Sequence, residues 1–97
     1  MAFKIVYTEN ALADLEAVLD YILADNPAAA FRFGDDLLNH VELLAVFPHI
    51  GSLVKRPAGI RKILHTPVRV YYQVHEDRRC IEILHFWHVA RQEPDGA

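Results

Sequence analysis

The first half of the chain carries its apolar residues at helical spacing. Side chains alternate in character over residues 2–8, which predicts a short strand, and Thr8 at its end stands where a helix N-cap is expected. Asn26-Pro27 is a second helix start, because Asn caps helices and Pro is tolerated at their first position. The second helix should stop before Pro48, and so short a break predicts an antiparallel helical hairpin. The expected apolar stripes are Leu12, Leu15, Val18, Leu19 and Ile22, then Ala30, Phe33, Leu37, Val41 and Leu44.

The period changes to that of strands in the second half. Residues 48–59 are rich in Pro and Gly and read as a loop, after which 60–66, 68–75 and 81–89 read as strands. Turns are expected at Thr66-Pro67 and at residues 76–79. The predicted order is β-α-α-β-β-β, an α+β domain over residues 1–97 with the hairpin packed on one face of a mainly antiparallel sheet.

Composition narrows the class of protein. At 53% hydrophobic residues, the chain can build one modest core. The longest stretch without a formal charge, residues 43–54, is far shorter than the roughly 20 apolar residues that a membrane-spanning helix needs. No signal-peptide pattern opens the sequence, and the single Cys80 has no partner for an intrachain disulfide. We therefore expect a cytoplasmic protein without membrane association.

The net charge of −3 conceals an uneven distribution. Residues 1–50 hold eight acids and two bases, whereas residues 51–97 hold eight bases and five acids. Such a split indicates a basic face directed at an anionic partner, or equally a set of scattered cations that keep a sheet in solution. Five cations occur between residues 51 and 71 without a carboxylate: Lys55, Arg56, Arg61, Lys62 and Arg69.

An ordered set of short motifs covers residues 3 to about 92. In this order and spacing, the sequence resembles the ParE/RelE toxin superfamily, whose members are often labelled plasmid-stabilisation proteins. The motifs are Ala11-x-x-Asp14-Leu15, Tyr21-Ile22-x-x-x-Asn26-Pro27-x-Ala29-Ala30, Phe47-Pro48-x-Ile50-Gly51, Gly59-x-Arg61, Val70-x-Tyr72-x-Val74, Ile81-x-Ile83-Leu84 and His88-x-x-Arg91. Each piece also has a plain structural task, so the resemblance speaks for the fold more directly than for an activity.

The resemblance implies one of two activities. RelE-like members are ribosome-dependent mRNA endonucleases, and Arg61, Arg69 and His88 would be the catalytic candidates, on one concave face of the sheet, with His88 as general acid. ParE-like members bind and inhibit DNA gyrase. The ParE-like branch is favoured because residues 88–94 lack the tyrosine usual in the nucleases, because the chain is net acidic, and because it ends in His88-x-x-Arg91. A third alternative is an inactive protein of this fold that only binds an antitoxin.

The resemblance also implies a cognate antitoxin, ParD-like or similar, that forms a hetero-oligomer with the chain and inhibits it. Its flexible tail would fold on binding. The expected antitoxin contacts are Leu12, Leu15, Leu19, Phe31, Leu38, Arg61 and Arg69, and the expected contacts to gyrase, or to ribosome and mRNA, are Lys55, Arg56, Arg61, Arg69, His88 and Arg91.

Each candidate also has a structural alternative. The alternative for Arg61 is a strand-entry cation with a structural partner, for Arg69 an exposed strand residue, and for His88 a satisfied histidine at the sheet margin. His85 and His88 would point to opposite sides of a strand, so we expect no metal site there, and no cofactor motif is present.

Overall fold

The computed structural model describes residues 2–89 and contains two long helices and a five-stranded sheet. The elements are β1 (Lys4–Tyr7), α1 (Glu9–Asp25), α2 (Pro27–Glu42), a 3-10 turn η1 (Leu43–Ala45), β2 (Ser52–Leu53), β3 (Ile60–His65), β4 (Val68–His75) and β5 (Cys80–His88). The predicted order and the α+β class are confirmed, with one additional strand, β2.

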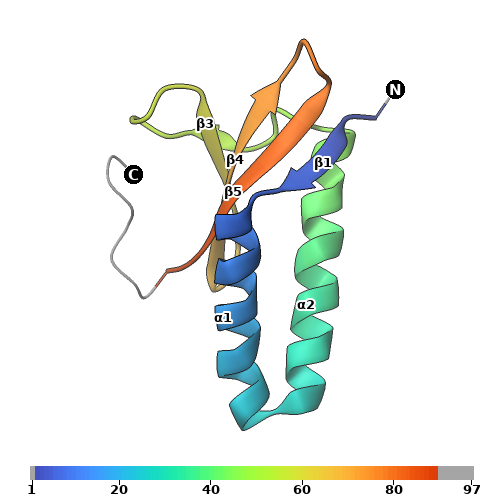
Figure 1. The fold of residues 1–97 in the computed structure, drawn as a ribbon, viewed down its shortest axis with the longest axis vertical. Helices are drawn as coiled ribbons and strands as arrows, with labels where there is room; N and C mark the ends of the chain where they lie inside the picture. Colours follow the sequence, from blue (N-terminus) through green and yellow to red (C-terminus); the bar gives the residue numbers. More distant parts are fainter. Residues whose placement is uncertain (1, 90–97) are drawn as a thin grey trace.

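Both helix starts are capped as the sequence predicts. Thr8 Oγ1 accepts a hydrogen bond from the Ala11 amide at 3.1 Å, and Asn26 Oδ1 accepts one from the Ala29 amide at 3.1 Å. The Thr8 hydroxyl also donates to the Ile83 carbonyl at 2.9 Å, which ties the start of α1 to β5. The helices lie side by side, and their connection points away from the sheet (Figure 1).

The sheet has the strand order β1-β5-β4-β3-β2. Only the β1–β5 pair is parallel, and the three other pairs are antiparallel hairpin neighbours along the chain. As a result, β5 lies between the first strand and β4 (Figure 1). The N-terminal strand therefore depends on the last strand for its hydrogen bonds.

The core lies between the helices and the sheet. Tyr72 and Phe86 are its largest fully buried side chains, and Leu37 and Val41 of α2 pack into the same cluster. On α1 the buried positions are Ala11 and Val18. Of the predicted α1 stripe, Val18 is buried and Leu15, Leu19 and Ile22 are half-buried, whereas Leu12 is 52% exposed.

Two further details differ from the sequence prediction. Ser52–Leu53 pairs with β3 inside the segment read as a loop. In β5, the register with β4 shifts between Tyr71 and Tyr72, so Phe86 is fully buried although simple alternation from Ile83 would have buried His85. The strand also ends at His88 and not at residue 89.

Candidate functional site

One buried tyrosine fixes the loop that follows α2. The Tyr72 hydroxyl accepts a hydrogen bond from the Gly51 amide at 2.9 Å and donates one to the Pro48 carbonyl at 2.9 Å. Burial raises the pKa of Tyr72, although the bond to Gly51 and the charge of Arg61 oppose the rise. The hydroxyl therefore stays protonated at neutral pH and can donate and accept at the same time.

Gly51 has no room for a side chain. A Cβ atom at this position would lie 2.6 Å from Tyr72 Oη and 2.7 Å from the carbonyl oxygen of Lys62. Such distances are well inside van der Waals contact, so only glycine lets the loop backbone pass this close to β3. The glycine of the Phe47-Pro48-x-Ile50-Gly51 motif is thus explained by contact with β3 and β4.

Arg61 adds a second attachment for the same loop. Its Nη1 donates to the Gly51 carbonyl at 2.7 Å and to the His49 carbonyl at 3.3 Å. This arginine, named by the sequence as a catalytic and binding candidate, thus holds backbone carbonyls on the helix side of the sheet. These contacts fit the structural alternative for Arg61, a strand-entry cation with a structural partner.

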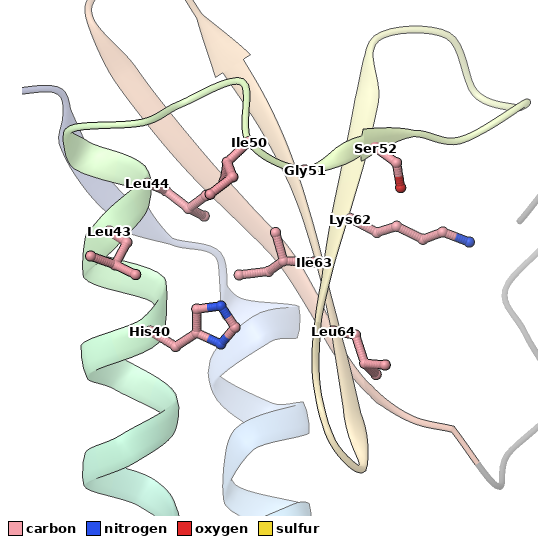
Figure 2. Close-up of a pocket in the computed structure, with 9 residues that line it drawn as sticks. All are labelled: His40, Leu43, Leu44, Ile50, Gly51, Ser52, Lys62, Ile63 and Leu64. Carbon is pink, nitrogen blue, oxygen red and sulfur yellow. The ribbon is translucent and has the colours of Figure 1, made fainter.

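The fixed loop forms one wall of a depression with a volume of about 310 Å³, which we call the α2–β3 groove. Figure 2 shows His40, Leu44, Ile50 and Ile63 directed into the space between α2 and β3, whereas Lys62 extends away from it. The groove is lined by His40, Leu43, Leu44, Ile50, Gly51, Ser52, Lys62, Ile63 and Leu64.

Large apolar side chains stand exposed in and beside this groove. Ile50 is 62% exposed and Leu43 is 48% exposed, and both line it. Leu64, 56% exposed, also belongs to the lining, but its side chain extends to the other side of β3 (Figure 2). Phe47 and Leu53, close to them in the chain, are also exposed. Isolated exposed apolar residues are ordinary, but a set this dense around one depression is typical of a protein-binding surface.

A histidine pair links the two walls of the groove. His40 Nδ1 on α2 lies 2.9 Å from His65 Nδ1 at the end of β3, and the ring centroids are 5.1 Å apart. The Phe33 ring packs edge-on against His65, with 5.5 Å between centroids. One imidazole must donate and the other accept, so at least one of the two rings is neutral.

The three nuclease candidates do not share a face of the sheet. Arg61 pairs with the buried Tyr72 and His88 pairs with the buried Val68, so both side chains belong to the helix side. Arg69 follows Val68 and therefore points to the opposite side. Arg61 and His88 are also separated by four residues along β4, about 13 Å at 3.3 Å per residue. The expected single concave catalytic face is not formed by these residues.

The remaining basic candidates are distributed differently. Lys55 and Arg56 are exposed in the loop between β2 and β3, where they are open to an anionic partner. Arg69 and His88 are half-buried and take part in contacts with other residues. Arg91 lies outside the described residues.

The predicted antitoxin contacts are also spread over the surface. Leu12 lies one turn into α1, at the sheet end of the hairpin, whereas Phe31, 75% exposed, lies in the second turn of α2 near the hairpin tip. Leu15, Leu19 and Leu38 are half-buried. The structure thus exposes Leu12 and Phe31 but does not bring them together.

Sequence reasoning missed a carboxylate–imidazole pair between α1 and β5. Asp14 Oδ2 lies 2.9 Å from His85 Nδ1 and accepts a second hydrogen bond from the Phe86 amide at 3.3 Å. Asp14 thereby holds β5 beside the register shift, and it orients the imidazole of His85, which is itself partly exposed. Asp14 of the Ala11-x-x-Asp14-Leu15 motif was the available signal, but nothing in the sequence named its partner.

The sequence also contained a signal for the groove. Residues 43–54 are the longest stretch without a formal charge, and they supply its exposed apolar residues on one side. Exposed apolar residues gathered in one segment are typical of a surface that another chain covers.

Within residues 2–89, no three His, Cys, Asp or Glu side chains stand in an arrangement that could hold a metal ion. Among the helices of this described part, none is long and apolar enough to cross a membrane.

Comparisons with known proteins agree with the resemblance seen in the sequence. The family model for the ParE toxin of the type II toxin–antitoxin system parDE matches residues 5–93. Toxin RelE2 of Caulobacter vibrioides is 34% identical over 88 residues, covering 91% of this chain and 97% of that protein.

Two solved structures share the fold. A structure of the chromosomal ParDE system from P. aeruginosa has a TM-score of 0.77, with 24% identity over 91% of this chain and 97% of that one. The toxin–antitoxin complex RelBE2 from Mycobacterium tuberculosis has a TM-score of 0.62, with 24% identity over 91% of this chain and 99% of the other. Taken with the family model and the sequence relative, this chain belongs to the ParE toxin family, within the ParE/RelE superfamily of type II toxin–antitoxin toxins.

Proposed function

We propose that this toxin acts as a ParE-like inhibitor that binds DNA gyrase, and that it does not cut RNA. The observation that carries the proposal is the separation of the nuclease candidates. Arg69 lies on the face of the sheet opposite Arg61 and His88, and Arg61 is engaged with the carbonyls of the 49–51 loop. General acid–base cleavage needs its groups within hydrogen-bond reach of one reacting phosphate, and these three side chains do not meet that condition.

The exposed cations of the β2–β3 loop are the best-placed contacts to the target. Lys55 and Arg56 are exposed side by side, and the described residues of this loop include no carboxylate to neutralise them. Such cations contribute to recognition of an acidic surface, mainly through the rate of association. We therefore assign the first contacts with gyrase to these two residues.

Purified gyrase and an in vitro translation reaction test the proposal together. The wild-type chain should inhibit supercoiling and leave translation unchanged. The double variant Lys55→Ala/Arg56→Ala should need about tenfold more protein for half inhibition, because each exposed charge contributes up to about 1 kcal/mol. Arg78→Ala, an exposed arginine in the β4–β5 turn, is the matched control and should stay within twofold of wild type.

The competing function is ribosome-dependent mRNA cleavage. Two observations favour it: the 34% identical relative is named Toxin RelE2, and Asp14 orients a partly exposed His85 that has the chemistry of a general base. Cleavage of ribosome-bound mRNA that disappears in His85→Gln would replace the gyrase proposal. A chain without effect in either reaction, but still bound by its antitoxin, would be the inactive alternative.

We further propose that a cognate antitoxin inhibits the toxin by laying an apolar segment into the α2–β3 groove. The groove combines apolar walls with an exposed apolar side chain, Ile50, that points into it (Figure 2). Ile50→Asp should weaken antitoxin binding about 30-fold or more, which corresponds to loss of a hot-spot residue. Val6→Asp, on the edge strand β1, is the matched control and should bind normally. If Phe31→Asp abolishes binding and Ile50→Asp does not, the hairpin tip is the docking surface instead.

A further inference from the structure

The contact between His40 and His65 has an unusual chemical requirement. Each Nδ1 is the other's hydrogen-bond partner at 2.9 Å, and a hydrogen bond needs one donor and one acceptor. A neutral pair meets this requirement, and so does a pair with a single extra proton. When both rings are protonated, neither Nδ1 can accept, and two positive charges face each other.

The contact also lies at a mechanically important position. His40 belongs to α2 and lines the groove, while His65 ends β3, so the pair closes the space between the helix and the edge of the sheet. Along the outer edge of β3, β2 pairs only with Arg61 and Lys62. Among the described residues, the second half of β3 therefore has no neighbouring strand on that edge. Residues 63–65 of β3 are therefore held by β4 along one edge and by contacts with α2, such as the His40–His65 pair, on the helix side.

We propose that His40 and His65 form a proton-sensitive latch that holds β3 against α2 and keeps the α2–β3 groove in its present shape. Uptake of the second proton breaks the hydrogen bond, separates the rings and loosens the wall formed by residues 63–65. This inference concerns the free chain, and it does not require the groove to be the antitoxin site. If the groove is that site, acid also weakens the antitoxin's docking surface.

The groups around the pair favour its neutral form, and therefore loss of the contact in acid. Burial lowers the pKa of His65, the charge of His40 lowers it further, and Asp36 on α2 opposes both effects. From the sheet, Lys62 contributes to the groove lining but its side chain extends away from the pair (Figure 2), and the neighbouring strand presents the apolar Val68 opposite His65. A histidine whose pKa is lowered in the folded state makes its full contribution to folding stability at pH values above its unfolded pKa, near 6.5. This contribution is lost as the pH falls from there towards the folded pKa.

A double-mutant cycle with His40→Gln and His65→Gln, repeated at pH 8 and pH 5 by urea unfolding of the whole chain, tests the latch. At pH 8 the coupling should lower the unfolding equilibrium constant by roughly two- to tenfold, the usual range for one hydrogen bond. At pH 5 the coupling should vanish or change sign. A coupling that is absent at pH 8, or equal at both pH values, overturns the proposal.

The same cycle on His75 and Glu82 provides the matched control. These side chains also form a contact at 2.9 Å, but the acceptor is a carboxylate, so the hydrogen bond does not require a neutral ring as its acceptor. Its coupling should be at least as large at pH 5 as at pH 8.

Amide hydrogen exchange of the wild-type chain gives a second readout that needs no variant. Residues 63–65 and 43–45 should exchange at least fivefold faster, relative to the intrinsic rates, at pH 5 than at pH 8, while β5 residues 81–83 keep their protection. If the two regions change in parallel, acid loosens the whole fold and there is no local latch.

Discussion

Gly51 determines how closely the loop can approach β3. Gly51→Ala should destabilise the chain by about 1–3 kcal/mol, the cost of forcing a methyl group into a filled space. The neighbouring atoms are Tyr72 Oη and the Lys62 carbonyl, which cannot move without breaking hydrogen bonds of the loop or the sheet. Urea unfolding measures the change.

Gly34 provides the control for this substitution. It lies buried in α2, and a Cβ atom there would be 3.5 Å from Leu19 Cδ2, an ordinary contact. Gly34→Ala should stabilise the chain by about 0.5–1 kcal/mol, because alanine loses less backbone entropy in a helix. Equal losses from the two substitutions would contradict the explanation given for Gly51.

The Tyr72 hydroxyl can be tested without changing the ring. Tyr72→Phe leaves the buried Gly51 amide without its acceptor and should cost about 1–3 kcal/mol. Tyr21→Phe, at a side chain that is 75% exposed, should change stability by less than about 0.5 kcal/mol. If the two variants unfold at the same urea concentration, the hydroxyl is not what fixes the loop.

At the scale of elements, the two helix caps differ in what they connect. Asn26→Ala removes one exposed capping bond and should cost about 1 kcal/mol. Thr8→Ala should cost more, because the Thr8 hydroxyl also donates to the Ile83 carbonyl of β5. Thermal unfolding of the two variants measures which one loses more stability, and a larger loss of stability in Asn26→Ala would contradict this expectation.

The elements that follow a local rule could be predicted from the sequence. Thr8 and Asn26-Pro27 marked the helix starts, and alternation from Val68 onward marked β4, because caps and periodicity are properties of neighbouring residues. The two residues of β2 are too few to show an alternation of apolar and polar side chains. The register shift at Tyr71 and Tyr72 depends on the pairing of β5 with β4, which is not a local property of either strand. For the same reason the sequence named Arg61 but could not show that the loop carbonyls engage it.

The candidate site was predicted less well than the fold, again for a physical reason. The His40–His65 contact joins residues 25 positions apart, and Asp14–His85 joins residues 71 apart. Pairs of this kind arise from the packing of helices on the sheet, which no local pattern encodes. Leu12 was assigned to the apolar stripe and to the antitoxin contacts, and helical spacing alone could not show which members of the stripe the core buries.

For the whole molecule, the pairing of β1 with β5 is the main long-range connection. Four residue pairs join these strands, and the Tyr7 ring stacks on Phe86 with 6.2 Å between centroids. Deletion of residues 2–7 should therefore abolish cooperative unfolding, because β5 loses one of its two neighbouring strands and the core loses one side. Near-UV circular dichroism through a thermal scan measures this, and a retained sharp transition would contradict it.

The place of β5 between β1 and β4 also has a consequence for the timing of synthesis. A growing chain can form its helical hairpin early, but β1 has no strand to pair with until residues 80–88 have been made. At about 5–20 residues per second, the nascent chain spends several seconds with its first strand unpaired and its core open. Any activity that needs the finished sheet therefore begins after the last strand leaves the ribosome, and a protective partner that is already present meets each new molecule before it has acted.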